Sequence, residues 1–332
     1  MDSAKSDEKK NISCCYIRRD NTQCPEPRTD DSAYCFWHNE KIPKDGEDIK
    51  EKLEKKVKTD SNCEGYILTK AKLNDVWLTE ANFNDAIFRK AQVKKGHCFG
   101  ISLKGADLFK AKFTGANLRH AKLNEANLIG TNFENSRIEN INWGRESKVL
   151  QEIQANIAHI HGRKKVAKSK YKDAEEIYIS LKNHFNVTGQ SKMVGQFFYR
   201  EMIAHRKQLS MFSLQRIFSK LADVSCGYGE KVKNIFLFSL LVIFVNAVFY
   251  SFAGVSSGDT YYSFSISVPL WDNVKTFFMM LYYSIVTFTT LGYGDISPAS
   301  PISRLLAGIE AFVGAFLVAL FVISVYKNMM SR

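Results

Sequence analysis

A strict five-residue period runs through the middle of this chain and constrains its fold more than any other feature. A large residue, mostly apolar, stands at every fifth position, and a small residue precedes most of them by two. So long a run at this period fits neither a helix, which repeats every 3.6 residues, nor a strand, which repeats every two. The large residues are Leu68, Leu73, Leu78, Phe83, Phe88, Val93, Cys98, Leu103, Leu108, Phe113, Leu118, Leu123, Leu128, Phe133, Ile138 and Trp143. The small ones are Ala71, Ala81, Ala86, Ala91, Ala106, Ala111, Ala116, Ala121 and Ala126, with Gly96, Thr131 and Ser136 as variants.

This pattern resembles the pentapeptide-repeat family, whose fold is a right-handed quadrilateral β-helix. The resemblance implies that four units make one coil, with the large residue and its small neighbour in the centre. The units then give about four coils, stacked at ~4.8 Å into a rod of ~19 Å, which we assign to residues 61–144.

The charge of the repeat bears on its partner, because some proteins of this family mimic DNA with an acidic surface. Residues 66–143 hold twelve Lys and Arg against seven Asp and Glu, which argues against such mimicry. A basic patch that meets nucleic acid or anionic lipid is one alternative. We favour a solvated surface with a modest positive excess and expect no nucleic acid partner.

A polar, glycine-punctuated run lies near the C-terminal end, between two long apolar segments: Thr289-Thr290-Leu291-Gly292-Tyr293-Gly294-Asp295. Backbone carbonyls can replace the water shell of a cation only in a conformation that most side chains forbid, and Gly292 and Gly294 permit it. A glycine pair alone is weak evidence, since turns use glycine too. The aromatic-rich segment 271–289 before the run, and the acid and Pro298 after it, favour a pore.

The run resembles the selectivity filter of potassium channels, and segment 271–289 resembles their pore helix. The resemblance implies that K⁺ is bound by residues 290–294, which are Thr290, Leu291, Gly292, Tyr293 and Gly294. The Thr290 hydroxyl is then the innermost ligand, and Tyr293 points outward into packed protein. We expect Thr289 and Asp295, at the two ends of the run, to support the filter.

Two apolar segments, at about 234–255 and 305–326, flank the pore helix and filter. Each has the ~20 residues that a helix needs to cross ~30 Å of hydrocarbon. The alternative, two buried helices of a soluble protein, leaves unexplained why both bracket a filter. Lys and Arg precede the first span and follow the second, which predicts cytoplasmic termini. Since one pair of helices cannot surround an ion, we expect a homotetramer in the lipid bilayer.

Five residues of the second span invite a functional interpretation. Gly314 costs helix stability, so it either permits close packing against the first span or is a hinge, as in the two-span potassium channels that this segment resembles. Below it, Val318, Val322 and Tyr326 recur on one helical face and are candidates for an inner gate. Glu310, a carboxylate within a span, should be paired or functional. We favour a supporting hydrogen bond to the pore helix or the back of the filter over direct contact with ions.

The first 60 residues contain a cluster of potential metal ligands but too little apolar material for a core. Cys24, Cys35 and His38, with Cys14 or Cys15, offer the four ligands of a tetrahedral zinc site. Disulfides are the rival explanation, but thiols stay reduced in the cytoplasm. The segment resembles small modules with three cysteines and one histidine at the head of some bacterial pentapeptide proteins. Their spacing implies Cys14, with Cys15 as the alternative, in a closed, structural Zn²⁺ site.

Residues 145–230 form a helical linker in our interpretation. Segments 174–185 and 191–209 resemble a tetratricopeptide-like helix pair, and the amphipathic segment 213–224 suits the membrane interface. A second GYG at 227–229 is interpreted as a turn, because no pore helix precedes it. Residues 231–332 then form the pore domain.

The complete order resembles prokaryotic pentapeptide-repeat, two-transmembrane ion channels. The resemblance implies a K⁺ channel of the inner membrane, gated or scaffolded by the cytoplasmic domain, on which an unknown ligand or protein could act. A nonselective cation channel is one alternative, because Leu291 stands where valine is commoner and Val286 where some relatives place a carboxylate. A membrane-tethered signalling or defence protein with a vestigial pore is another. We find no catalytic motif and expect no enzyme.

Overall fold

The structure is a computed structural model that describes residues 13–258 and 260–330. The chain divides into two compact units at the boundary between Gln208 and Leu209, and each is described by itself.

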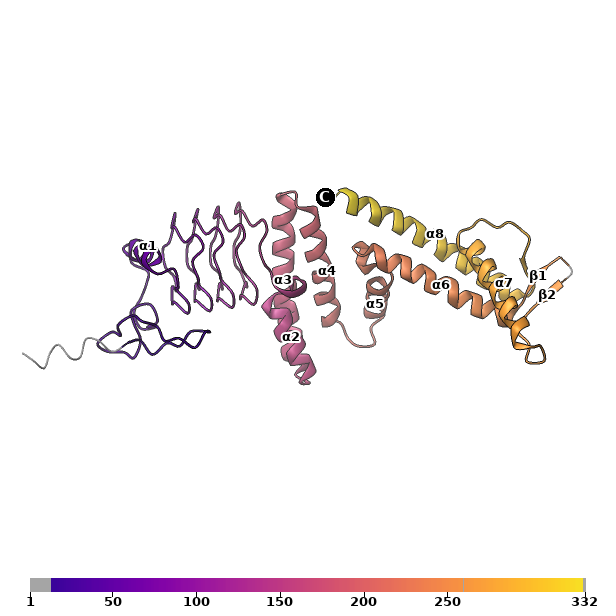
Figure 1. The fold of residues 1–332 in the computed structure, drawn as a ribbon, viewed down its shortest axis with the longest axis horizontal. Coiled ribbons are helices and arrows are strands. Elements are labelled where there is room, and N and C mark those ends of the chain that lie inside the picture. Colours follow the sequence, from indigo (N-terminus) through magenta and orange to yellow (C-terminus); the bar gives the residue numbers. More distant parts are fainter. Residues whose placement is uncertain (1–12, 259, 331–332) are drawn as a thin grey trace, which may run out of the picture. The chain divides into compact units, whose positions relative to one another are not determined.

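The rod of the first unit is a stack of coils in which each bridge joins residues twenty positions apart (Figure 1). The parallel bridges run from the pair Asn62 and Asn82 to the pair Lys122 and Asn142. A spacing of twenty residues means four five-residue units per coil, so the predicted repeat fold is confirmed. The large repeat residues are all buried, none more than 6% exposed, and they form one continuous core.

The first coil is covered by the N-terminal segment and by helix α1 (Ile49–Thr59), which the sequence analysis missed. Ile49 and Leu53, one helical turn apart, bury their side chains in the rod's core cluster. Trp37 stacks on Tyr66 of the first coil with ring centroids 5.2 Å apart. These contacts cover an end of the stack that would otherwise expose apolar side chains and unpaired backbone groups.

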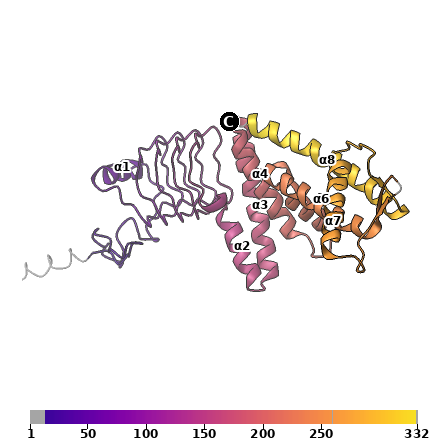
Figure 2. The same cartoon turned by 45° about the vertical axis from the view of Figure 1, so that its right-hand side comes forward.

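The last coil is covered by helices. After a 3₁₀ turn, η2 (Arg145–Ser147), come α2 (Leu150–Ile160), α3 (Lys164–Val187) and α4 (Ser191–Gln208), with α3 and α4 side by side (Figures 1 and 2). Trp143, the last large repeat residue, meets the rings of Phe185 and Phe197 edge to face, at 6.2 and 5.4 Å. The core of the rod therefore continues into the helices, whose tetratricopeptide-like nature stays a prediction.

The second unit contains two helices long and apolar enough to cross a membrane, α6 (Val232–Ala253) and α8 (Pro301–Met330). Helix α5 (Leu214–Cys226) and a 3₁₀ turn, η3 (Gly227–Gly229), precede α6. Between the spans, α7 (Leu270–Phe288) packs against both of them. These helices lie within a few residues of the predicted spans and pore helix, although α8 extends about one turn further at each end.

A small antiparallel sheet, not predicted, joins the loops between the spans. Its order is β2 (Thr260–Tyr262), β1 (Val255–Ser257), β3 (Ser297–Pro298). Strand β1 directly follows α6, and β3 directly follows the glycine-punctuated run. The pairing of Ser256 with Ser297 therefore joins the Asp295 end of that run to the end of α6.

Truncation of a core ring should destabilise the rod. Phe88 is fully buried and lies 5.4 Å from the ring of Phe83. Phe88→Ala leaves a cavity and should lower the free energy of unfolding by about 3–5 kcal/mol, measured by urea titration of the full chain followed by circular dichroism. Lys122→Ala, on the exposed surface of the same rod, should change it by no more than about 0.5 kcal/mol. Equal effects of the two substitutions would contradict the assignment of Phe88 to the core.

Candidate functional site

The glycine-punctuated run begins where α7 ends. The backbone N–H groups of Thr290 and Leu291 donate to the carbonyls of Thr287 and Val286, both at 3.0 Å, and close the last turn. Beyond it, φ is positive at alternate residues: 58° at Thr290, 55° at Gly292 and 80° at Gly294. Glycine adopts this conformation freely, whereas Thr290 is strained by it. The alternation keeps the run out of regular helix or strand.

All residues from 290 to 295 are exposed in a single chain. Leu291 is 58% exposed and Tyr293 is 68% exposed. The sequence analysis expected Tyr293 to point into packed protein, and one chain alone does not supply that packing. The Thr290 hydroxyl, expected to face the ion, here donates to the carbonyl of Thr289 at 2.7 Å.

The two ends of the run are held differently. At the Asp295 end, the Tyr282 hydroxyl of α7 donates to a carboxylate oxygen of Asp295, and Ser257 of β1 donates to the Asp295 carbonyl, both at 2.9 Å. At the other end, the Thr289 hydroxyl donates to the carbonyl of Ile285 at 2.7 Å, so it bonds α7 rather than the run. Asp295 was predicted from its place in the run, whereas Tyr282 and Ser257 lie outside the run and were not predicted.

Glu310 joins the three long helices of the second unit. Its side chain is buried, and its carboxylate accepts hydrogen bonds from Tyr250 of α6, at 2.7 Å, and from Ser284 of α7. The bond to α7 is one of the two contacts favoured from the sequence; Tyr250 carried no sequence signal. Since a buried carboxylate is costly without hydrogen bonds, these two donors explain how Glu310 is tolerated within a span.

Gly314 lies where α8 meets the last residue of α7. A Cβ added at Gly314 would lie 2.1 Å from the carbonyl oxygen of Phe288 and 2.9 Å from its carbonyl carbon. The atoms nearest to this position therefore belong to the end of α7, whereas the sequence hypothesis of close packing named the first span. Helix α8 runs through Gly314 without interruption, and its role as a hinge stays a prediction.

The C-terminal half of α8 contains the gate candidates Val318, Val322 and Tyr326, which are 49%, 60% and 64% exposed in one chain. Beside them, Ser324 donates to the carbonyl of Gly229 at 3.1 Å, and Lys327 forms an ion pair with Glu230. The second GYG thus forms a turn next to the C-terminal part of α8, as the sequence indicated.

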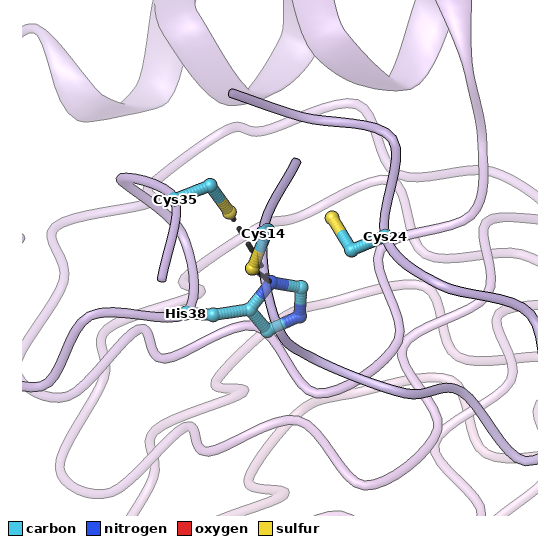
Figure 3. A group of neighbouring side chains, drawn as sticks. All are labelled: Cys14, Cys24, Cys35 and His38. Carbon is cyan, nitrogen blue, oxygen red and sulfur yellow. Dashed lines mark hydrogen bonds between the residues drawn. The ribbon is translucent and has the colours of Figure 1, made fainter. Parts of the chain in front are cut away.

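A separate cluster lies in the N-terminal segment (Figure 3). Cys14, Cys24, Cys35 and His38 are all buried, with their ligand atoms within 4.8 Å of one another. Cys15, the alternative ligand, is exposed and outside the cluster. Tetrahedral zinc with Zn–S bonds of ~2.3 Å places its sulfur ligands about 3.7 Å apart, which this grouping fits.

The imidazole of His38 is oriented for metal binding. Its Nε2 lies 2.8 Å from the carbonyl oxygen of Glu64, and it must carry the proton to bond there. In the neutral ring with this tautomer, Nδ1 carries the lone pair and faces the sulfur atoms of Cys35, at 3.2 Å, and Cys14, at 3.5 Å. A backbone acceptor behind the second ring nitrogen is typical of metal-binding histidines.

The thiols of the cluster differ in acidity. A hydrogen bond from Cys35 lowers the pKa of the Cys24 thiol well below its ordinary value, and His38 adds to the effect. The same hydrogen bond raises the pKa of Cys35, and burial raises it further. The cluster therefore already favours one thiolate, the form that binds metal.

Comparison with known proteins supports both units. A family of ion channels matches residues 237–331, and pentapeptide repeats match residues 60–95 and 101–140 in eight copies. The chain therefore combines a pentapeptide-repeat domain with an ion-channel domain. Both parts of the combination that its sequence resembles are therefore matched, each over less than a third of the chain.

Solved structures match the repeat locally. A pentapeptide repeat protein from Nostoc PCC 7120 is 26% identical, with a TM-score of 0.25, over 26% of this chain and 71% of its own. HetL, from Nostoc sp. strain PCC 7120, is 27% identical, with a TM-score of 0.16, over 23% of this chain and 38% of its own. A search of curated proteins finds no match. The repeat fold rests on the family match and on the coils themselves.

The contact at Gly314 can be tested against a second glycine of the same helix. Gly314→Ala should force α7 and α8 apart and destabilise the second unit by about 1–3 kcal/mol, lowering its thermal unfolding temperature in detergent. Gly308→Ala meets no atom within 4 Å and should not lower it. The contact is refuted if the two substitutions shift the unfolding temperature equally.

Proposed function

We propose that four copies of this chain form a K⁺-selective channel in the inner membrane of a prokaryote, with both termini cytoplasmic. The observation that carries the proposal is the run from Thr290 to Gly294, within the part of the chain that matches ion channels. It follows a helix, has positive φ at both glycines, and is anchored at its outer end by Asp295. Carbonyls presented by such a run are the ligands with which channels replace the water of K⁺.

The surroundings of the run support cation binding. Helix α7 ends directly before it, so the negative end of the helix dipole lies beside the site where an ion would pass. Glu310 holds α7 at Ser284, one turn before its end, and Gly314 allows α8 to touch that end. We assign a supporting role to Glu310, Asp295 and Thr289, although Thr289 acts on α7 rather than on the run.

Exposure supports the tetramer. Leu291 and Tyr293 are more than half exposed in one chain, and so are Val322 and Tyr326 of α8. Copies of the chain around a closed axis supply the packing that these side chains lack. We place the inner gate at Val318, Val322 and Tyr326, with Gly314 as the hinge above it.

Regulation is assigned to the N-terminal unit, which would respond to a cytoplasmic ligand or protein. Helix α5, the first helix of the second unit, connects to it through the chain and exposes Leu214, Ile217, Phe218 and Leu221. These apolar side chains, with Arg216 and Lys220 between them, suit a helix that lies in the membrane interface.

The filter can be tested with one substitution at two glycines. Gly292→Asp removes the conformation that the carbonyls need and places a side chain in the pore, so K⁺ flux into liposomes should fall to background. Gly258→Asp, at another positive φ of 57° with nothing within 4 Å, should keep the flux.

Reversal potentials in mixed K⁺ and Na⁺ distinguish a K⁺-selective channel from a nonselective cation channel. Leu291 and Val286 are the residues that favour the nonselective alternative. A chain that carries no current in any condition would instead support a tethered interaction protein.

We also propose that Cys14, Cys24, Cys35 and His38 hold a structural Zn²⁺ ion. The four ligands are buried and fill a tetrahedral shell, which leaves no open position for catalysis. In a segment with so few apolar residues, metal binding supplies folding energy that packing does not.

Metal content tests this assignment. The purified full chain should contain about one zinc ion per chain, measured by inductively coupled plasma mass spectrometry. Cys24→Ser should lose it and unfold the N-terminal segment at a lower temperature, whereas Cys15→Ser, outside the cluster, should keep both. If Cys24→Ser retained zinc, or if Cys15→Ser lost it, the proposed set of zinc ligands would be contradicted.

A further inference from the structure

The coil register places equivalent residues of successive coils directly above one another. Since bridges join residues twenty apart, Lys70, Lys90 and Lys110 occupy the same corner of three coils. Each has a positive φ, of 60°, 58° and 55°, and each is exposed. Coils are ~4.8 Å apart, so these lysines form a row along the rod.

Two adjacent sides of the first three coils meet at this corner. They comprise residues 66–75, 86–95 and 106–115, and we call them the basic face. The basic face holds eight exposed cationic residues: Lys70, Lys72, Arg89, Lys90, Lys94, Lys95, Lys110 and Lys112. It holds two carboxylates, Asp75 and Asp107.

The two opposite sides of the same coils are balanced. Residues 76–85, 96–105 and 116–125 contain three cationic residues, Lys104, Arg119 and Lys122, and three acids, Glu80, Asp85 and Glu125. The modest positive excess counted along the sequence is therefore concentrated on one face. A sequence count cannot show this, because it averages over sides that point in opposite directions.

The charges of the basic face are largely unneutralised. Arg89 pairs with Asp107 at 2.5 Å. Among the residues that the structure describes, no ion pair involves any of the seven lysines of this face. Seven like charges held this close repel one another, which favours an anionic partner.

We propose that the basic face docks on anionic phospholipid headgroups of the membrane that the spans cross. Seven of its eight cations are lysines, compact charges that suit a diffuse anionic surface better than the paired hydrogen bonds of base recognition. Its one aromatic ring that is not fully buried, Phe109, is partly buried and lies under the ammonium group of Lys110, at 5.2 Å, so it offers no platform for stacked bases. The spans tether the rod near headgroups, which raises their effective concentration.

Lysine footprinting of the full chain tests the proposal. The protein is placed in nanodiscs of phosphatidylcholine alone or with a third of phosphatidylserine, and acetylation of each lysine is followed by mass spectrometry at low salt. With phosphatidylserine, acetylation should be about fivefold slower at Lys70, Lys90, Lys94 and Lys110. A factor of about five corresponds to the ~1 kcal/mol by which one lysine is stabilised near an anionic surface. Lys122, exposed on the opposite sides, should not change, and high salt should abolish the difference.

A charge-reversed variant provides the second measurement. Lys70→Glu, Lys90→Glu and Lys110→Glu together should abolish the slower acetylation of Lys94, while circular dichroism confirms that the rod is folded. Equal acetylation in both nanodiscs would overturn the proposal. So would protection of the same lysines by added single-stranded RNA in phosphatidylcholine nanodiscs without protection by phosphatidylserine. Because the readout is chemical labelling and not current, it stands or fails independently of ion selectivity.

Discussion

The second unit depends on one buried carboxylate. In a hydrocarbon environment no water can satisfy a polar group, so Glu310 must find its partners in neighbouring helices. It finds Tyr250 on α6 and Ser284 on α7, and thereby holds three helices in one arrangement. The glycine-punctuated run begins directly after Phe288, the residue of α7 that touches Gly314, and its position is set by the helix that Glu310 holds. Support for the run is thus placed on rigid elements rather than on the loop itself.

In the first unit, both ends of the stack of coils are covered by other segments of the chain. At one end the aromatic residue Trp143 carries the core into α3 and α4. At the other, a segment that cannot build a core of its own is organised around Cys24 and its neighbouring ligands and packs on the first coil through Trp37. The Cys and His cluster and the helical pair therefore both protect coil edges, one at each end of the stack.

Patterns that repeat along the chain were predictable, and contacts across it were not. The coils follow from a period of five, and the spans follow from their length and apolar composition. Helix α1 was missed because only Ile49 and Leu53 are buried in a segment otherwise rich in Lys and Glu. The sheet was missed because its strands are two or three residues long. Tyr250 lies 60 residues from Glu310, and no local pattern connects the two.

The turn at Gly229 and Glu230 has a mechanical consequence. It immediately precedes α6, and through Ser324 and Lys327 it also holds the C-terminal part of α8. A segment two residues before α6 thus joins the start of the first long apolar helix to the end of the second. A displacement transmitted along the chain through α5 would therefore reach both helices at the same point.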